Sequence, residues 1–361
     1  MAVIQADALK RFVADIFARI GCSQAEAARI ALYLVNANLT GHDSHGVVRV
    51  PRYVQWKEEG SILPDQPIKI VSDTPVLAVI DGQYGFGQTC APEATRIGIE
   101  KCKAMGLSAI ALRNAGHIGR VGEWAEMAAA EGLVSVHFVN AAGSILVAPF
   151  GGTQRRFSTA PYSVGLPRKD APPLILDFAT SVVAEGKVLV ASQGGKALPA
   201  NALIDADGSI SADPAVLYGP VPEGEVPNYK SGPGAIRAFG DHKGSGLAFM
   251  CEMLGGALTG TGATLEGRRF ANGMLSFFID PAVVDPDAFM PDEIDRYVAY
   301  VKSAQPAQAG VPVMVPGEPE IARRAEREAG GVTLSDETWG AICATARHVG
   351  LDDARIATAT G

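Results

Sequence analysis

Residues 41 to 49 hold two imidazoles, a carboxylate, a hydroxyl and a guanidinium between flanking glycines. His45 can give or take a proton near neutral pH, and Ser44 beside it can orient the imidazole or a substrate oxygen. Arg49 is permanently charged and forked, so it can hold a carboxylate through two hydrogen bonds. Arg52 and Tyr53 extend this polar stretch. Together these residue types predict half of an active site for a substrate that carries a carboxylate.

The same stretch has two other interpretations. Asp43 or Ser44 could simply satisfy backbone donors at a helix end or turn. His42, Asp43 and His45 could instead bind a metal, as in a metal-dependent hydrolase or lyase. The stretch alone does not decide among catalysis, capping and metal binding.

The composition bounds the class of protein. The chain has 361 residues, 47% of them hydrophobic and 19% charged, with a net charge of −8, which argues against a nucleic-acid partner. No secretory leader or membrane-spanning run is recognisable, so no membrane is expected. Five scattered cysteines without a C-x-x-C pair predict a reduced, cytoplasmic protein with no structural zinc: Cys22, Cys90, Cys102, Cys251 and Cys343.

Helices and strands alternate around the polar stretch. Helical spacing of apolar residues predicts helices over 6–20 and 23–39, the second opened by a capping-box pair, Ser23 and Glu26. A strand at 108–112, a glycine-rich loop at 113–122, a helix at 123–131 and a strand at 134–139 predict an α/β unit. Such a loop can bind phosphate at the helix N-terminus, or its glycines can merely permit tight turns. The G-x-G-x-x-G pattern is incomplete, so a Rossmann domain is not supported.

Three further segments bear on function. Asp177 ends the apolar run 174–179 and could cap a following helix that closes at Gly186 and Lys187, or orient an imidazole. A second charged glycine-rich loop, 240–246, contains His242 and opens another helix. A solvated helix face is predicted in the helical tail by charged pairs among Arg323, Arg324, Glu326, Arg327 and Glu328.

Four motifs in this order resemble those of the malate/L-lactate dehydrogenase family of NAD(P)-dependent oxidoreductases, and most of all its members that act on hydroxycarboxylates. They are Gly41-His42-Asp43-Ser44-His45-Gly46, Gly116-His117-Ile118-Gly119-Arg120-Val121-Gly122, Leu176-Asp177-Phe178-Ala179-Thr180-Ser181 and His242-Lys243-Gly244-Ser245-Gly246-Leu247. The resemblance implies a non-Rossmann α/β fold with a helical part built from both chain termini. It also implies a homodimer that binds NAD or NADP and a small carboxylate substrate.

The resemblance implies three parts of the chain. Residues 1–75 form a helical part with the catalytic loop, joined by the C-terminal helices of 320–361. Residues 76–135 and 240–319 form an α/β part for substrate and dimer contacts, and residues 136–239 form a cofactor-binding part.

The family's site residues carry over by position. His45 matches the proton donor, with Ser44 and Asp177 as relay partners; Arg49 matches the residue that holds the carboxylate; and His117 is a second acid–base candidate. The cofactor contacts carried over in this way are His45, Gly119, Arg120, Val121, Ile175, Leu176, Asp177, Phe178, Ala179, His242, Asn272, Gly317, Glu318 and Pro319. One departure concerns Ser158-Thr159-Ala160-Pro161, where many relatives have Gly-Thr-Asn-Pro.

These observations predict an NAD(P)H-dependent oxidoreductase that interconverts a 2-oxo acid and its 2-hydroxy acid. One alternative keeps the fold but reduces a cyclic imine carboxylate, such as piperideine- or pyrroline-2-carboxylate, with the same His45 and Arg49. The metal-dependent enzyme built on His42, Asp43 and His45 is another, and a non-catalytic binding protein is a third.

Overall fold

The computed structural model describes residues 1–192, 196–220 and 231–359, which form two compact units. Unit 1 comprises Met1–His137, Ser163–Asp177 and Ser276–Gly361, and unit 2 comprises Phe138–Tyr162 and Phe178–Leu275. Parts of the predicted cofactor-binding segment, at 193–195 and 221–230, lie outside the described residues. The three-part division expected from the family resemblance stays a prediction.

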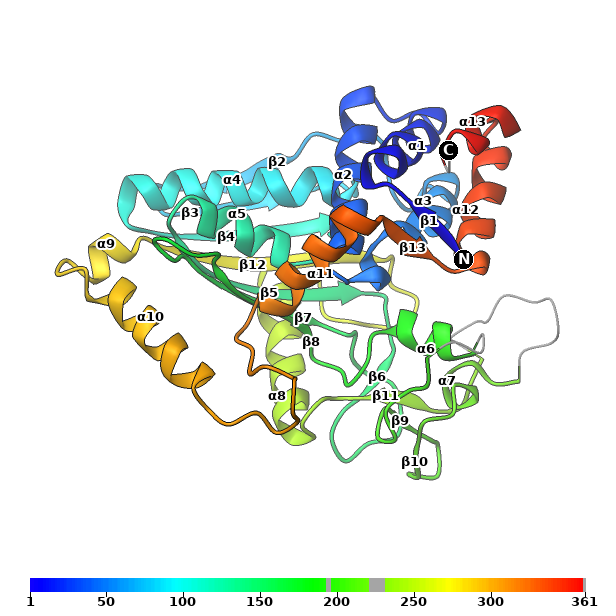
Figure 1. The fold of residues 1–361 in the computed structure, drawn as a ribbon. Helices are drawn as coiled ribbons and strands as arrows, with labels where there is room; N and C mark the ends of the chain where they lie inside the picture. The colour runs from blue at the N-terminus through cyan, green and yellow to red at the C-terminus, as the bar shows by residue number, and fades with distance from the viewer. Residues whose placement is uncertain (193–195, 221–230, 360–361) are drawn as a thin grey trace. The chain divides into compact units, whose positions relative to one another are not determined.

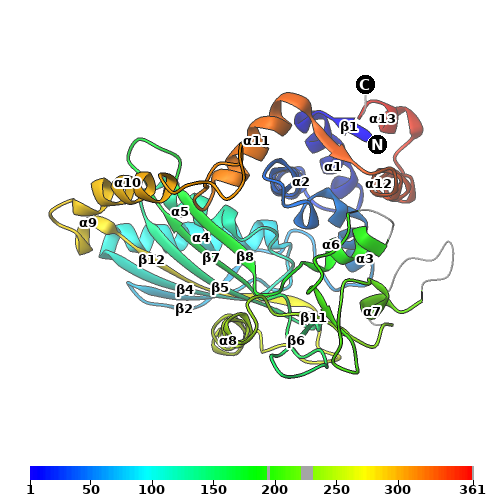
Figure 2. The same cartoon turned by 60° about the horizontal axis from the view of Figure 1, so that its bottom comes forward.

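In unit 1, helices from both ends of the chain share one hydrophobic core (Figure 1). Those helices are α1 (Ala6–Arg19), α2 (Gln24–Leu39), α3 (Val50–Glu58), α12 (Asp336–His348) and α13 (Asp353–Ala357). The first strand, β1 (Ala2–Ile4), pairs antiparallel with β13 (Val332–Leu334). Leu9, Phe12 and Phe17 of α1 are fully buried, as expected for one apolar stripe at helical spacing. The two ends of the chain therefore lie in the same packed layer of unit 1 (Figure 2).

The α/β portion of unit 1 begins with β2 (Lys69–Asp73) and β3 (Leu77–Asp81), which are antiparallel. Helix α4 (Gly87–Met105) then connects β3 to β4 (Leu107–Ala115), and these two strands run parallel. A helix between parallel strands is the βαβ arrangement. The glycine-rich loop after β4 leads into α5 (Gly122–Ala130), so the predicted strand, loop and helix are confirmed.

The largest sheet has seven strands in the order β2-β3-β4-β12-β5-β7-β8. Its remaining strands are β5 (Val134–Ala142), β7 (Pro161–Leu166), β8 (Leu174–Ala179) and β12 (Ala271–Ile279). Strands distant in sequence, such as β4 and β12, are neighbours, and parallel and antiparallel pairs both occur. The predicted mixed α/β class is confirmed.

Three further helices belong to unit 1: α9 (Pro281–Val284), α10 (Phe289–Lys302) and α11 (Glu318–Gly330). Unit 2 contains α6 (Glu185–Ser192), α7 (Ala215–Tyr218), α8 (His242–Cys251) and a π-helix (Glu252–Leu258). A small sheet of order β10-β9-β11-β6 lies there too, formed by β6 (Val147–Ala148), β9 (Leu203–Ile204), β10 (Ile210–Ser211) and β11 (Ala235–Arg237). The predicted helix end at Gly186 and Lys187 is wrong, because α6 begins at Glu185.

No helix in the described ranges is both long enough and apolar enough to cross a lipid bilayer.

His137, a fully buried residue of β5, gives unit 1 a built-in acid sensitivity. Its two ring nitrogens contact the hydroxyls of Ser276 (2.8 Å) and Ser135 (3.1 Å). Burial lowers the pKa of His137 from 6.5 to about 3, so the folded state keeps this ring neutral. Below the unfolded-state pKa, only the unfolded chain takes up the proton, and stability falls as pH falls from about 6.5 toward 3.

We therefore expect His137→Gln to weaken the pH dependence of the free energy of unfolding. In the unaltered protein, His137 should lower the free energy of unfolding by about 1.4 kcal/mol for each pH unit below 6.5. At pH 5 this loss is about 2 kcal/mol relative to pH 7. Urea unfolding of both proteins near pH 7 and near pH 5 measures the difference. Equal pH slopes in the two proteins would show that His137 is not the source.

Candidate active site

The polar stretch between α2 and α3 folds into two short 3-10 turns, Asp43–His45 and Val47–Arg49. Asn38 of α2 braces both turns: its amide nitrogen donates to Asp43 Oδ1 at 2.6 Å, and its amide oxygen accepts from the Val47 N–H at 2.8 Å. Gly46 is required there, because a Cβ atom at this position would lie 2.2 Å from Asn38 Oδ1. One buried amide thus fixes the conformation of the loop.

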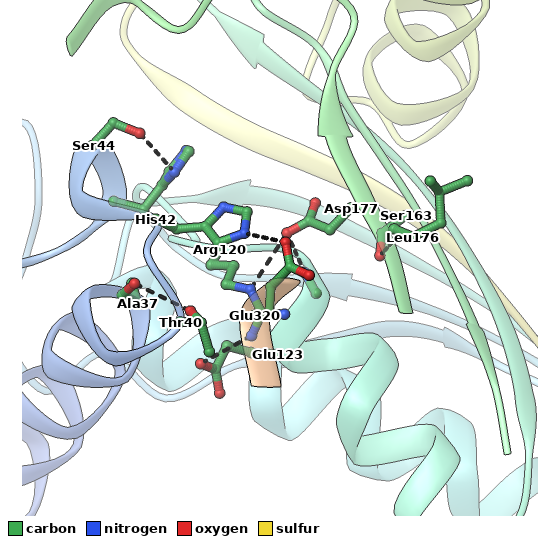
Figure 3. Close-up of polar contacts among 12 residues, drawn as sticks. Ala37, Thr40, His42, Ser44, Arg120, Glu123, Ser163, Leu176, Asp177 and Glu320 are labelled. Carbon is green, nitrogen blue, oxygen red and sulfur yellow. Dashed lines mark hydrogen bonds and ion pairs between the residues drawn. The ribbon is translucent and has the colours of Figure 1, made fainter. Parts of the chain in front are cut away.

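Helix α11 also contacts this loop. Arg327 donates two hydrogen bonds to the Asp43 carboxylate, at 2.6 and 3.0 Å, the bidentate geometry that arginine favours. His42 Nε2 lies 3.3 Å from Glu320 Oε1 (Figure 3). The predicted solvated face at 323–328 is therefore wrong for Arg327, which is a partner of the loop.

The contacts of His42, Asp43 and His45 can be compared with the hypothesis that these three residues bind a metal. Asp43 and His42 are engaged by α11, and His45 has a hydroxyl neighbour of its own. Within the described ranges, no group of three or more His, Cys, Asp or Glu side chains is placed to hold a metal ion.

His45 and His117 stack face to face, with ring centroids 5.6 Å apart and planes within 2° of parallel. Ser44 Oγ lies 3.2 Å from His45 Nδ1, and Arg49 Nε donates to the Ser44 carbonyl at 2.6 Å. Burial, then the electrostatic effects of His117 and Arg49, lower the pKa of His45 well below 6.5. Burial and Arg49 lower the pKa of His117 to about 3. Near neutral pH both imidazoles are therefore neutral.

Tyr53 of α3 and Gln88 of α4 support the second imidazole. The fully buried Tyr53 hydroxyl lies 2.6 Å from His117 Nδ1, and Gln88 Nε2 donates to that hydroxyl at 3.0 Å. Arg52 is exposed and donates to Gln55 in its own helix. Substrate contacts of Tyr53 and Arg52 stay predictions.

Gly87 lets α4 begin directly against the His117 loop. A Cβ atom on Gly87 would lie 2.2 Å from the His117 carbonyl oxygen and 2.5 Å from its carbon. Backbone atoms cannot move aside as a flexible side chain can. We expect Gly87→Ala to displace His117 and to lower kcat by roughly 10²-fold, as a misplacement of about 1 Å can.

Gly340→Ala in α12 is the matched control for that change, since nothing lies within 4 Å of its added Cβ. The control should keep full turnover and gain up to about 1 kcal/mol of stability from helix propensity. Steady-state kinetics and thermal unfolding compare the two proteins. Similar kcat values in both would refute the steric argument.

Arg120 sits among three carboxylates, as Figure 3 shows in part. Its guanidinium is 2.8 Å from Glu126, 3.6 Å from Glu123 and 3.7 Å from Asp177, and its side chain is fully buried. Asp177 Oδ2 also accepts from the Gly122 N–H at 2.9 Å. Asp177 therefore binds the first residue of α5 and faces Arg120, and its predicted relay with His45 stays a prediction.

Glu123 has a perturbed carboxyl group. Burial and the neighbouring Glu126 raise the pKa of Glu123 to about 7, against the lowering effect of Arg120. Arg120 Nε and Nη1 have no hydrogen-bond partner within the part of the chain that the structure describes.

The other predicted cofactor residues of unit 1 lie on the adjoining turns and strand. Gly119 (φ +72°) precedes Val121, the residue before α5. Gly317 (φ +93°) precedes α11, and a Cβ there would lie 3.2 Å from the backbone of Ile175. Leu176 accepts a hydrogen bond from Ser163 Oγ at 2.8 Å. Glu318 accepts from the Val315 N–H and pairs with Lys302, and Pro319 stands in the first turn of α11.

The remaining predicted residues lie in unit 2. Phe178 packs edge-on against Phe239, and Ala179 ends β8. His242 is exposed at the start of α8 with its ring against Phe150. Asn272 is buried and donates to the Asn140 carbonyl at 2.6 Å.

Ala160, the departure from the family pattern, is fully buried in unit 2 with a φ of +29°. Its N–H donates to Ser158 Oγ, and its carbonyl accepts from Thr180 Oγ1. A left-handed backbone favours glycine or asparagine over alanine. Ala160 therefore holds a strained backbone conformation that the asparagine found in many relatives would adopt more easily.

The site residues not predicted from the sequence include Gln88, Glu123 and Glu320. Gln88 follows the Gly85-Phe86-Gly87 turn, and that close-packing signal could have pointed to it. Glu123 and Glu320 stand in first helical turns, where acidic residues are common for helix stability alone. Only their contacts in the folded structure distinguish these two residues from acidic residues that merely stabilise a helix.

Comparison with known proteins supports the family resemblance found in the sequence. Residues 4–343 match the family model described as malate/L-lactate dehydrogenase. Hydroxycarboxylate dehydrogenase B of Escherichia coli K12 is 39% identical over 353 residues, which cover 96% of this chain and 94% of that protein. The structure of sulfolactate dehydrogenase from Methanocaldococcus jannaschii is 29% identical, with a TM-score of 0.82 over 97% of this chain and 98% of that one.

A third similar structure is the delta1-piperideine-2-carboxylate reductase of Pseudomonas syringae pvar. tomato, at 26% identity and a TM-score of 0.78 over 96% and 100% of the two chains. The chain belongs to the malate/L-lactate dehydrogenase family. It is thus a dehydrogenase of the class acting on hydroxy acids, and the predicted family is confirmed.

Proposed function

We propose that this chain interconverts 2-oxo acids and 2-hydroxy acids with NAD or NADP as the hydride carrier. The observation that supports this most is the stacked pair of neutral imidazoles, His45 and His117, beside the Arg49 guanidinium. A carboxylate anchor next to a proton-exchanging group is what a 2-oxo acid requires.

The chain's residues divide the work. Arg49 holds the substrate carboxylate, so that the reacting carbon has a fixed orientation. His45 takes the hydroxyl proton in oxidation and returns it to the carbonyl oxygen in reduction. Ser44, 3.2 Å from His45 Nδ1, orients that ring. The nicotinamide cofactor, when bound, supplies or accepts the hydride.

The residues of unit 1 fit such a cofactor. Arg120 carries two buried N–H groups, Nε and Nη1, without a hydrogen-bond partner in the described part of the chain. Its charge is already balanced by Glu126, Asp177 and Glu123, so these N–H groups suit a neutral oxygen such as that of a carboxamide. The turns at Gly119 and Gly317 allow close backbone approach. We propose that Val121, the 175–179 run, His242, Asn272, Glu318 and Pro319 complete the cofactor contacts.

A second candidate function is reduction of a cyclic imine carboxylate. The similarity to the Pseudomonas syringae piperideine-2-carboxylate reductase favours it. Arg49 and His45 would take the same roles, because this substrate also carries a carboxylate beside the reducible carbon.

A spectrophotometric screen tests both functions. Purified protein is mixed with NADH or NADPH and with a panel of 2-oxo acids and cyclic imine carboxylates. Cofactor oxidation with the oxo acids supports the main proposal and identifies NAD or NADP, whereas oxidation with the imines alone supports the second. Silence across the panel, with cofactor binding confirmed by fluorescence, would contradict both substrate classes.

The proposal includes a homodimer in the cytoplasm. Ile70 and Val71 of β2 are about half exposed, and apolar side chains on an edge strand support a partner subunit. The five cysteines are all free, which supports a reducing compartment. Analytical ultracentrifugation should give twice the 37.6 kDa chain mass.

A further inference from the structure

Three side chains form a hydrogen-bonded chain that ends at the His117 ring. Gln88, at the start of α4, and Tyr53, in α3, are both fully buried. Gln88 Nε2 lies 3.0 Å from the Tyr53 hydroxyl, and that hydroxyl lies 2.6 Å from His117 Nδ1. Since water does not reach these two side chains, their hydrogen-bond partners are protein groups.

The direction follows from the donors. The amide nitrogen of Gln88 can only donate, so the Tyr53 oxygen accepts there. The hydroxyl's own proton can point to His117 Nδ1 at 2.6 Å or to the His117 carbonyl at 3.4 Å. If Nδ1 carried the proton and donated to Tyr53, the hydroxyl proton would be left with the weak 3.4 Å contact. Both groups form their best hydrogen bond when the hydroxyl donates to Nδ1, so Nδ1 accepts and carries no proton. A neutral imidazole has its single proton on the other nitrogen, Nε2.

We propose that Gln88 and Tyr53 are positioning residues that hold His117 as the Nε2–H tautomer, which makes His117 a neutral hydrogen-bond donor to an oxygen of the bound acid. The proton exchange then belongs to His45 alone. This inference rests on the proposed function for the identity of the bound acid, whereas the tautomer itself does not depend on it.

The geometry around His117 agrees with a donor role. The ring is stacked on His45 at 5.6 Å, and Arg49 adds positive charge beside both rings. A positive imidazole in this position would be repelled by Arg49. A neutral N–H aimed at an oxygen stabilises negative charge that develops during hydride transfer, without a proton of its own to lose.

The tautomer can be observed directly. Nitrogen NMR of protein labelled with ¹⁵N-histidine near neutral pH distinguishes protonated from bare ring nitrogens, and His117→Gln identifies the signals of His117 by their loss. We expect His117 to be protonated at Nε2. In Tyr53→Phe, which keeps the ring packing against Phe17 and Phe86, the Nδ1–H tautomer should appear. Protonation of His117 at Nδ1 in the unaltered protein, or no change in Tyr53→Phe, would overturn the proposal.

Kinetics test the donor role separately. The His117→Gln amide still offers an N–H, so we expect it to retain kcat within about tenfold, while His117→Leu loses roughly 10²–10³-fold. Equal loss in both variants would assign proton exchange to His117 and overturn the donor role. The NMR result stands even if every assayed substrate fails, so failure of the inference and failure of the proposed function are distinguishable.

Discussion

Replacing His45 with alanine is expected to lower kcat by roughly 10²–10⁴-fold, the usual contribution of general acid–base catalysis. Cofactor binding, measured by NADH fluorescence, should persist, because the proposed cofactor contacts of Arg120 and the adjoining turns remain. His348→Ala is the matched control: this histidine is exposed and pairs with Glu58 at 2.7 Å. Loss of folding and cofactor binding together in His45→Ala would instead identify a structural histidine.

The direction of the pKa change at His45 makes this prediction sharper. Because its pKa lies well below 6.5, the ring is neutral near pH 7 and is ready to accept a proton. The oxidation rate should therefore be constant with pH around neutrality, and its acid limb should fall below pH 6.5. Reduction needs the protonated ring, so its rate should rise as the pH is lowered. An oxidation limb centred at or above 6.5 would contradict the assignment.

The grouping of the polar loop residues was predictable because they are neighbours in sequence. His45, Ser44 and Arg49 span six positions, and any turn of this length keeps them close. When residues are this close in sequence, their spacing alone is enough to predict that they lie close together in the structure. A place for His117 in the same site was implied only by the family resemblance.

The braces of that loop were not predictable. Arg327 reaches Asp43 across 284 positions, and Gln88 reaches Tyr53 across 35. Both pairs depend on which helix faces pack together, and a charged helix such as α11 looks the same in sequence whether it faces water or a partner. Only the packing of the folded chain determines whether that helix face meets water or another helix.

The capping box at α2 shows the same limit within one motif. Ser23 accepts from the Glu26 N–H at 3.2 Å, as predicted. The Glu26 side chain, however, does not return to Ser23: it accepts from Thr89 Oγ1 at 2.7 Å and from the Asp65 N–H at 2.5 Å. Asp65 accepts from the Ser23 N–H in its place. The predicted hydrogen bond from the Glu26 N–H to Ser23, which depends only on the helix, was correct. The predicted return bond from the Glu26 side chain was wrong, because residues from other parts of the chain bind that carboxylate instead.

Replacing Arg120 with methionine should strongly destabilise the fold. The side chain is fully buried, and its charge balances Glu126, Asp177 and the already perturbed Glu123. Removing one partner of a buried ionic group leaves the others uncompensated and typically costs about 3–5 kcal/mol. The free energy of unfolding in urea measures this loss.

Arg96→Met provides the comparison, because Arg96 pairs with Glu100 on the exposed face of α4. An exposed pair of this kind contributes about 0–1 kcal/mol, so the control should change little. The loss in Arg120→Met should also shrink as the pH is lowered, since protonated carboxyls no longer repel one another. A similar small change in both variants would show that the three carboxylates do not depend on Arg120, and that another group balances their charge.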